Sequence, residues 1–455
     1  MRRIIAAMSE RVDAMRRAVH GQSAGALQPP ADTPRPRPRD PNAPTVLVIN
    51  DSRDQINYGA EALVDGLLHI LDVALPNHTR RLIPSHWLDE AGIPSAFHSG
   101  DSLEYPGESA VWPAVADQFE CIADEWLAGR GGHGAAAYLK KLEGVDIVVL
   151  NGEGSIYRTN ISAVRELFLA WFAKTRLGIP TVFLNGTVQL TSIMPVLPAM
   201  VRKTFRALDA VAVRGPYSLR NVQEFVPDVA VRLFPDSALA LPVEIDSPSP
   251  GVKAIFNQLG RSPFFCFDPG PMTIDYRFGK RSSLFRMITD VKTLDVQAVM
   301  AVSGPSEASM LKQLAADTDS VYLEQQPSYR DLMAVLARAK FQISGRNHNL
   351  LLGARVGCPA IAIASISHKV HGVCEQLRFG APYDGTDLSA NIERITADAA
   401  SILGRGMTLR DEVRNHAARL AAESFEMGVL VKDVLARHPR LAAPGVSERG
   451  AYSPS

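Results

Sequence analysis

Short apolar segments separated by helix-length stretches most constrain how this 455-residue chain can fold. Each segment is rich in Val, Ile, Leu, Ala and Phe, a composition typical of strands that are buried on both faces of a sheet. Helical stretches separate most of them, and strand–helix alternation over this length predicts an α/β protein with parallel, doubly wound sheets. The predicted strands are 45–50, 145–151, 180–185, 209–214, 264–267, 296–302, 341–344 and 359–364.

The alternation is interrupted once, by the polar, proline-containing stretch 243–263. We therefore expect two Rossmann-like domains, at 45–245 and 262–400, rather than one. A long amphipathic stretch at 408–437 predicts one C-terminal helix that packs back across the junction of the two domains. The tail 438–455 has no such pattern and is predicted to be disordered.

The amino-terminal end is predicted to lie outside the globular part. Residues 1–27 include a basic amphipathic helix, which either frays, packs on a partner, or lies on an anionic membrane surface through residues 1–20. The prolines of 28–44 indicate an extended linker. No apolar run reaches about 18 residues and no secretory signal is present, so the expected location is the cytoplasm, with peripheral contact at the inner face of the membrane as the alternative.

Charge and cysteine content exclude several functional classes. Lys+Arg and Asp+Glu both number 48, so no net positive field recruits nucleic acid. The four cysteines form no CxxC pair, which fits a reducing compartment. A zinc site at His368, His371 and Cys374 is disfavoured, because residues at i, i+3 and i+6 fan out around a helix, which is poor for one ion. We expect no metal and no cofactor.

Strand ends supply the candidate site residues, because ligands of open parallel sheets bind outside the carboxyl ends of the strands. Asn57 and Gly59 follow the first strand and begin a helix. The free N–H groups at the start of that helix could bind an anion or a hydroxyl-rich ligand. The alternative is that Asn57 only caps the helix. Gly152 and Gly154 flank Glu153, so the backbone can approach a ligand while one carboxylate orients a hydroxyl or acts as a base. Turn geometry alone also explains such a glycine pair.

Two further strand ends carry charged residues. Arg214 ends the strand 209–214, where a guanidinium either binds a phosphate or carboxylate through two bonds or is only solvated. Asp236 follows Pro235, and we expect it to act mainly as a cap or turn residue.

The segment "ISGRNHNLLLGARVG" is the most specific of these strand ends. Arg346 and His348 lie two residues apart and point to the same side if the chain is still extended there. Arg346 then holds an oxyanion and His348 moves a proton, while the N–H of Asn347 begins a helix. Lys369 follows the next strand. Together they predict an anion pocket with an acid/base inside it, unless the loop is an ordinary polar turn.

The order of these landmarks resembles that of the polysaccharide pyruvyl transferase family, which is itself similar to two-domain GT-B glycosyltransferases. The resemblance covers about residues 45–385. It is carried by "NYGAEAL", "NGEGSIY", "VRGPYSLRNV", "FPDSALAL" and "SGRNHNLLLGARVGCPAIAIASISHK", of which the last is the most specific.

The resemblance implies a transferase that moves a pyruvyl unit from phosphoenolpyruvate to a pair of hydroxyls on a saccharide or lipid-linked glycan. The products are a pyruvate ketal of a cell-surface polysaccharide and phosphate. It implies that the two domains face each other across a cleft, with the donor bound by the second domain. The implied roles are donor binding for Arg214, Arg346 and the N–H of Asn347, acid/base catalysis for His348, and acceptor contacts for Glu153 and Asn57.

Two other functions remain open at this point. A GT-B glycosyltransferase would use the same cleft for a nucleotide sugar and the same cations for its diphosphate. A non-catalytic relative would only bind glycan. The presence of Arg214, Arg346, His348 and Lys369 together argues against the non-catalytic relative.

Overall fold

The structure is a computed structural model. It describes residues 43–54, 57–85, 113–154, 156, 161–192, 196–270, 281–301, 305–323, 328–364 and 368–438. The predicted amino-terminal helix, nearly all of the proline-rich linker (up to residue 42) and the tail from residue 439 lie outside the described residues.

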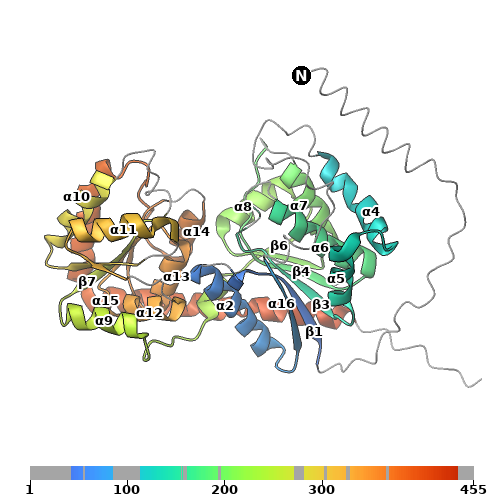
Figure 1. Cartoon of the computed structure of the whole chain (residues 1–455), viewed down its shortest axis with the longest axis horizontal. Helices are drawn as coiled ribbons and strands as arrows, with labels where there is room; N and C mark the ends of the chain where they lie inside the picture. The colour runs from blue at the N-terminus through green and yellow to red at the C-terminus, as the bar shows by residue number, and fades with distance from the viewer. Residues whose placement is uncertain are drawn as a thin grey trace, which may run out of the picture. The chain divides into compact units, whose positions relative to one another are not determined.

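The first half of the described chain forms a sheet of parallel strands in the order β2-β1-β3-β4-β5-β6. Alternate residues of its central strands pack on opposite faces, because successive side chains of a strand point to opposite sides. Val46 and Val48 contact the layer of α2 and α16, while Leu47 packs under α4, α5, α6 and α7 (Figure 1). The strands are β1 (Thr45–Asp51), β2 (Thr79–Pro84), β3 (Ile147–Asn151), β4 (Thr181–Gly186), β5 (Ala210–Val213) and β6 (Val231–Leu233).

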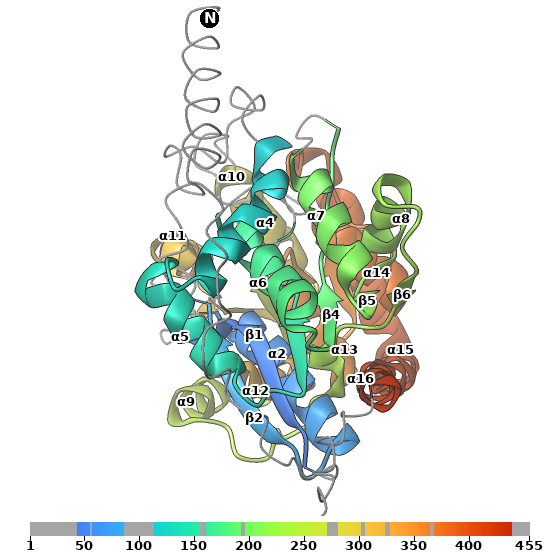
Figure 2. The same ribbon diagram turned by 90° about the vertical axis from the view of Figure 1, so that its right-hand side faces the viewer.

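The helices of this half connect its strands. They are α2 (Tyr58–Ala74), α4 (Pro113–Leu127), α5 (Gly132–Leu142), α6 (Ile161–Leu177), α7 (Val196–Ala207) and α8 (Pro216–Phe225). A short 3-10 helix, η4 (Ser237–Ala240), follows β6. Figure 2 shows the same layers from the side, with α2 beside β1 and β2.

The second half forms another parallel sheet, in the order β11-β10-β7-β8-β9. One face packs against α10, α11 and the beginning of α15, and the other against α9 and α12. The strands are β7 (Phe264–Asp268), β8 (Gln297–Met300), β9 (Val321–Tyr322), β10 (Gln342–Ser344) and β11 (Ala360–Ala362). The helices are α9 (Pro250–Leu259), α10 (Arg281–Lys292), α11 (Pro305–Asp317), α12 (Tyr329–Arg338), α13 (Asn347–Arg355) and α14 (Lys369–Leu377).

The predicted fold class is confirmed: two parallel sheets alternate with helices, and every predicted strand is present. Three edge strands, β2, β6 and β9, were not predicted. β2 has the sequence "TRRLIP" and its first residues are exposed, so it lacks the continuous apolar run of a buried strand. β9 spans only Val321–Tyr322, which is too short to produce a pattern.

Each sheet has one point where the strand order reverses. In the first sheet it lies between β1 and β3, and in the second between β7 and β10. The carboxyl ends of two neighbouring strands leave a crevice at such a point, which is where open α/β sheets bind ligands. Glu153 follows β3, and Arg346 and His348 follow β10, so both reversal points carry predicted site residues.

The carboxyl-terminal helices differ from the single helix predicted over 408–437. Helix α15 already begins at residue 392 (Ile392–Ser424), is kinked at Gly406 (φ 53°), and is followed by a separate α16 (Glu426–Arg437). The break places Phe425 beside His69, with ring centroids 5.7 Å apart, and turns α16 onto α2. A Cβ at Gly428 would lie 2.7 Å from that of Ala74, so the two helices approach closely.

These two helices together contact the layers of both sheets, as predicted. Helix α15 packs on α10, α13 and η4, while α16 packs on α2 and β5. The buried guanidinium of Arg410 fixes α15 by donating to the carbonyls of Ala337 and Ala339 at the end of α12. Although α15 is long, no helix in the described ranges is both long and apolar enough to span a bilayer.

Candidate active site

A buried ion pair lies at the carboxyl edge of the first sheet. Arg214, directly after β5, donates from Nη1 to Asp236 Oδ2 at 2.6 Å, and both side chains are at most 5% exposed. Its Nε donates to Thr187 Oγ1 at 2.8 Å. Asp236 also caps η4, since its Oδ1 accepts the N–H of Ala238 at 2.9 Å. Asp236 is therefore both the predicted cap and the counterion of Arg214.

The ring of His348 lies between this ion pair and the start of α2. Its Nε2 is 3.4 Å from Arg214 Nη1 and 3.8 Å from Asp236 Oδ2. A Cβ on Gly59 would lie only 2.1 Å from His348 Nδ1, so only glycine leaves room for the ring in this position. Asn57 caps α2 by accepting the N–H of Gly59 at 2.9 Å. The first turn of α2 thus positions the imidazole.

The environment of His348 keeps its imidazole neutral at pH 7. Its pKa is lowered to about 4, mainly by burial and also by the nearby cations of Arg214 and Lys369, while the carboxylates of Asp236 and Glu153 oppose the shift. A neutral imidazole has an unprotonated nitrogen that can accept a proton. His348 is thus suited to act as a base.

Lys369 is the first residue of α14 and lies in the same electrostatic environment. Burial and the charge of Arg214 lower its pKa to about 8, while Glu153 and Asp236 oppose the shift. The ammonium group therefore stays mostly protonated at pH 7. The charges of Arg214, Asp236 and Glu153 affect the pKa values of both His348 and Lys369. The site therefore combines residues that follow strands of both sheets.

The two glycines of the predicted ligand-binding turn have structural explanations. A Cβ on Gly152 would lie 2.2 Å from the ring of Phe183, so this glycine is required by packing. Gly154 has a φ of 72°, which glycine adopts without strain. The carbonyl of Glu153 accepts from Asn50 Nδ2 at 3.3 Å, which holds the turn against the end of β1.

Arg346 and His348 point in different directions, contrary to the expectation of an extended chain. Arg346 is the N-cap of α13, and the helix begins at Asn347, so the strand geometry ends before His348. Arg346 Nε lies 3.8 Å from Asp268 Oδ1, and the guanidinium is 24% exposed. Arg346 thus lies beside Asp268, whereas Asn347 lines the pocket beside Arg214.

Asp268 was not singled out in the sequence. It ends β7 at the reversal point of the second sheet, is 1% exposed, and accepts from Asn349 Nδ2 at 3.2 Å and from Tyr58 Oη at 3.3 Å. Tyr58 also donates to Asn349 Oδ1. This network joins the first turn of α2 to α13. The strand-end rule, applied to "FFCFDPG", would have found it.

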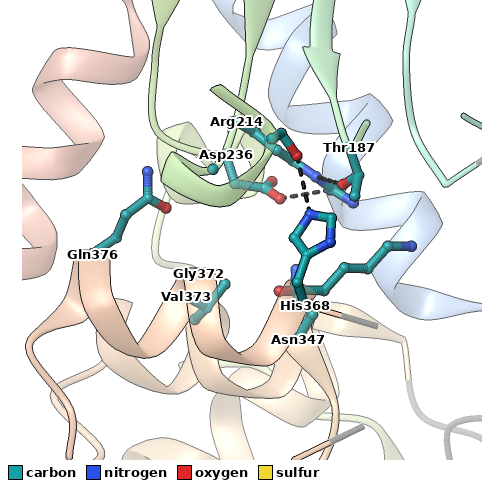
Figure 3. A pocket seen from close by; sticks show the side chains of 11 residues that line it. Thr187, Arg214, Asp236, Asn347, His368, Gly372, Val373 and Gln376 are labelled. Atoms are coloured by element: carbon teal, nitrogen blue, oxygen red, sulfur yellow. Dashed lines mark hydrogen bonds and ion pairs between the residues drawn. The ribbon is translucent and has the colours of Figure 1, made fainter. Parts of the chain in front are cut away.

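A small pocket opens beside the ion pair (Figure 3). Figure 3 shows Thr187, Arg214 and Asp236 on one wall and the residues of α14 on the other. His368 bridges the walls, since its Nε2 is 3.2 Å from Ser218 Oγ. The lining residues are Thr187, Arg214, Gly215, Ser218, Asp236, Asn347, His368, Lys369, Gly372, Val373 and Gln376.

His368 and Ser218 were missed as a pair in the sequence. They lie 150 positions apart, so no local sequence pattern connects them. In the part of the chain that the structure describes, no group of three or more His, Cys, Asp or Glu residues is placed to hold a metal ion.

Comparison of the sequence with models of known protein families identifies the family of this chain. The model of the polysaccharide pyruvyl transferase family matches residues 57–368, which is more than half of the chain. The chain belongs to the polysaccharide pyruvyl transferase family. It is thus a member of a family of polysaccharide-modifying transferases, and the match runs from Asn57 to His368, through Glu153, Arg214, Asp236 and His348. No curated protein matches the sequence.

Solved structures show the same fold at low sequence identity. UDP-GlcNAc 2-epimerase from Neisseria meningitidis, bound to UDP-GlcNAc, has a TM-score of 0.53 at 11% identity and covers 86% of this chain and 100% of its own. UGT71G1 from Medicago truncatula, complexed with UDP-glucose, has a TM-score of 0.52 at 12% identity and covers 87% and 99%. This pyruvyl transferase family member therefore has the GT-B fold.

Proposed function

We propose that this protein transfers the pyruvyl unit of phosphoenolpyruvate to two hydroxyls of a glycan, forming a pyruvate ketal in cell-surface polysaccharide biosynthesis. The observation that carries the proposal is the cluster of Arg214, His348 and Lys369 at the carboxyl ends of strands from two sheets. It supplies two cations and one neutral imidazole in one place. Family membership supports the same reaction class.

The donor is a compact polyanion, so its binding site needs local cations rather than a basic protein. Lys369 and Arg214 supply them, together with the N–H groups that begin α8 and α13 at Gly215 and Asn347, since both residues line the pocket. Arg346 lies at the adjacent strand end beside Asp268 and belongs to the proposed donor side. Asn57, Gly59, Glu153 and the flanking Gly152 and Gly154 form the proposed acceptor side.

In the proposed reaction, a proton from solvent water is added to C3 of phosphoenolpyruvate, which makes C2 electrophilic. A glycan hydroxyl then forms a bond to C2 and loses its proton. Neutral His348 is the proposed acceptor of that proton, because its pKa of about 4 leaves one ring nitrogen unprotonated at pH 7. Phosphate leaves with the electron pair of the C2–O bond, and the second hydroxyl completes the ketal.

Phosphoenolpyruvate is expected to raise the melting temperature more than UDP or a UDP-sugar does, because a ligand that binds only the folded state stabilises it. At 100 times the dissociation constant this stabilisation is about 2.7 kcal/mol. The measurement is thermal unfolding of the full-length protein with each ligand and with inorganic phosphate as the control. Stabilisation by UDP compounds alone would favour a nucleotide-sugar glycosyltransferase instead. No stabilisation by any donor would favour a glycan-binding protein without activity.

A further inference from the structure

A second histidine of the pocket, His368, is held in a defined hydrogen-bonded chain. Its Nδ1 lies 3.2 Å from Gln189 Oε1, and its Nε2 lies 3.2 Å from Ser218 Oγ. The ring stacks on Tyr217, with centroids 5.8 Å apart and planes at 26°. Ser218 and His368 both line the pocket beside Arg214.

The partners of His368 determine which nitrogen carries its proton. A carbonyl oxygen only accepts hydrogen bonds, so the Nδ1 that faces Gln189 Oε1 is the protonated nitrogen. Nε2 is then an acceptor, and the hydroxyl of Ser218 donates to it. Ser218 Oγ also accepts the N–H of Val188 at 3.0 Å, which fixes the oxygen in place. The result is a serine hydroxyl oriented toward a basic nitrogen.

The charge state of His368 agrees with this arrangement. Its pKa is lowered to about 4, mainly by burial and also by the cations of Lys369 and Arg214. The pocket region therefore contains two neutral imidazoles, His348 on α13 and His368 just before α14. One lies against the first turn of α2, and the other lies against the first turn of α8.

Ketal formation requires two hydroxyls to lose protons. The first addition to C2 consumes one glycan hydroxyl, and the departure of phosphate leaves C2 electrophilic for the second. A single imidazole that has accepted the first proton is no longer a base until it releases that proton. A site that forms a ketal thus benefits from a second proton acceptor on the pocket wall.

We propose, on the basis of the proposed function, that Ser218 and His368 form the proton acceptor for the second glycan hydroxyl. The second hydroxyl oxygen forms its bond to C2, and its proton passes to Ser218 Oγ as the serine proton moves to His368 Nε2. Gln189 is the positioning residue that keeps Nε2 unprotonated before this step. The step consumes no further reactant, since the proton is released to water after the ketal leaves.

The test compares phosphate release with ketal formation by the full-length protein, using phosphoenolpyruvate and a glycan that the wild type accepts. The wild type should form one ketal for each phosphate. In His368→Asn the second addition should be slower by about 10²-fold or more. Water then captures C2, and the hemiketal decomposes to pyruvate and the original glycan. Phosphate release should thus continue while ketal formation falls and free pyruvate increases.

Four more variants separate this role from a structural one. Ser218→Ala should uncouple the two products in the same way. Gln189→Glu keeps an oxygen acceptor for Nδ1 and should still form one ketal for each phosphate. Gln189→Leu removes that acceptor and should release more phosphate than it forms ketal. His133→Asn, which changes an exposed histidine on α5 outside the pocket lining, is the control and should form one ketal for each phosphate.

Two results would overturn the proposal. One is a His368→Asn enzyme with unchanged ketal yield and rate, and the other is a parallel loss of phosphate release and ketal in both His368→Asn and Ser218→Ala. If the wild type itself releases no phosphate from phosphoenolpyruvate, the proposed function fails and the role of the second base fails with it. That outcome is seen before any variant is made.

Discussion

Replacing His348 by asparagine should lower kcat by about 10²- to 10⁴-fold while leaving phosphoenolpyruvate binding intact. Asparagine is polar and smaller than histidine, so it fits beside Gly59 without a clash. It cannot accept a proton, however, and the base for the first hydroxyl is lost. The measurement is steady-state phosphate release, combined with the thermal shift produced by phosphoenolpyruvate.

His133→Asn is the matched control, because His133 is an exposed histidine on α5 and is not one of the residues of the site. It should have wild-type turnover. A His348→Asn protein that binds the donor and turns over at nearly the wild-type rate would show that His348 is not the base. Loss of donor binding along with turnover would assign the ring to binding instead.

Replacing Asp236 by alanine should destabilise the protein by about 3–5 kcal/mol, because it leaves the guanidinium of Arg214 buried without a counterion. Both side chains are at most 5% exposed, so water cannot replace the carboxylate. The substitution also removes the cap of η4, which packs against α2 and α13. Denaturant unfolding followed by tryptophan fluorescence gives the change in stability.

The pair Arg206–Asp228 provides an internal comparison. Its side chains are 54% and 47% exposed, so Asp228→Ala should lower the stability much less than Asp236→Ala does. If Asp236→Ala costs no more than Asp228→Ala, the buried ion pair does not stabilise the site. The electrostatic environment ascribed to His348 would then need revision.

Local pattern in the sequence was enough to predict most of the fold. Buried parallel strands such as β3 and β4 are continuous apolar runs, and their burial on both faces produces that pattern directly. Edge strands lack it. The break at Phe425 was not predictable from periodicity, because it depends on how closely Gly428 approaches α2.

The candidate site was predictable only as a set of strand ends. The rule that ligands bind at the carboxyl ends of strands selected Arg214, Asp236, His348 and Lys369 before any contact was known. It did not indicate which of them touch, since the contact between Arg214 and His348 joins residues 134 positions apart. The predicted direction of the Arg346 side chain was wrong, because it depends on where α13 begins.

The most direct test of the proposed function follows the pyruvyl carbon itself. Phosphoenolpyruvate labelled with ¹³C at C2 is incubated with the full-length protein and with glycans extracted from the cells that make it, and the products are analysed by NMR. We predict that the label becomes a carbon bonded to two glycan oxygens and a methyl group, with one phosphate released per ketal. If the label stays in phosphoenolpyruvate while the same glycans accept a sugar from a UDP-sugar, pyruvyl transfer is contradicted.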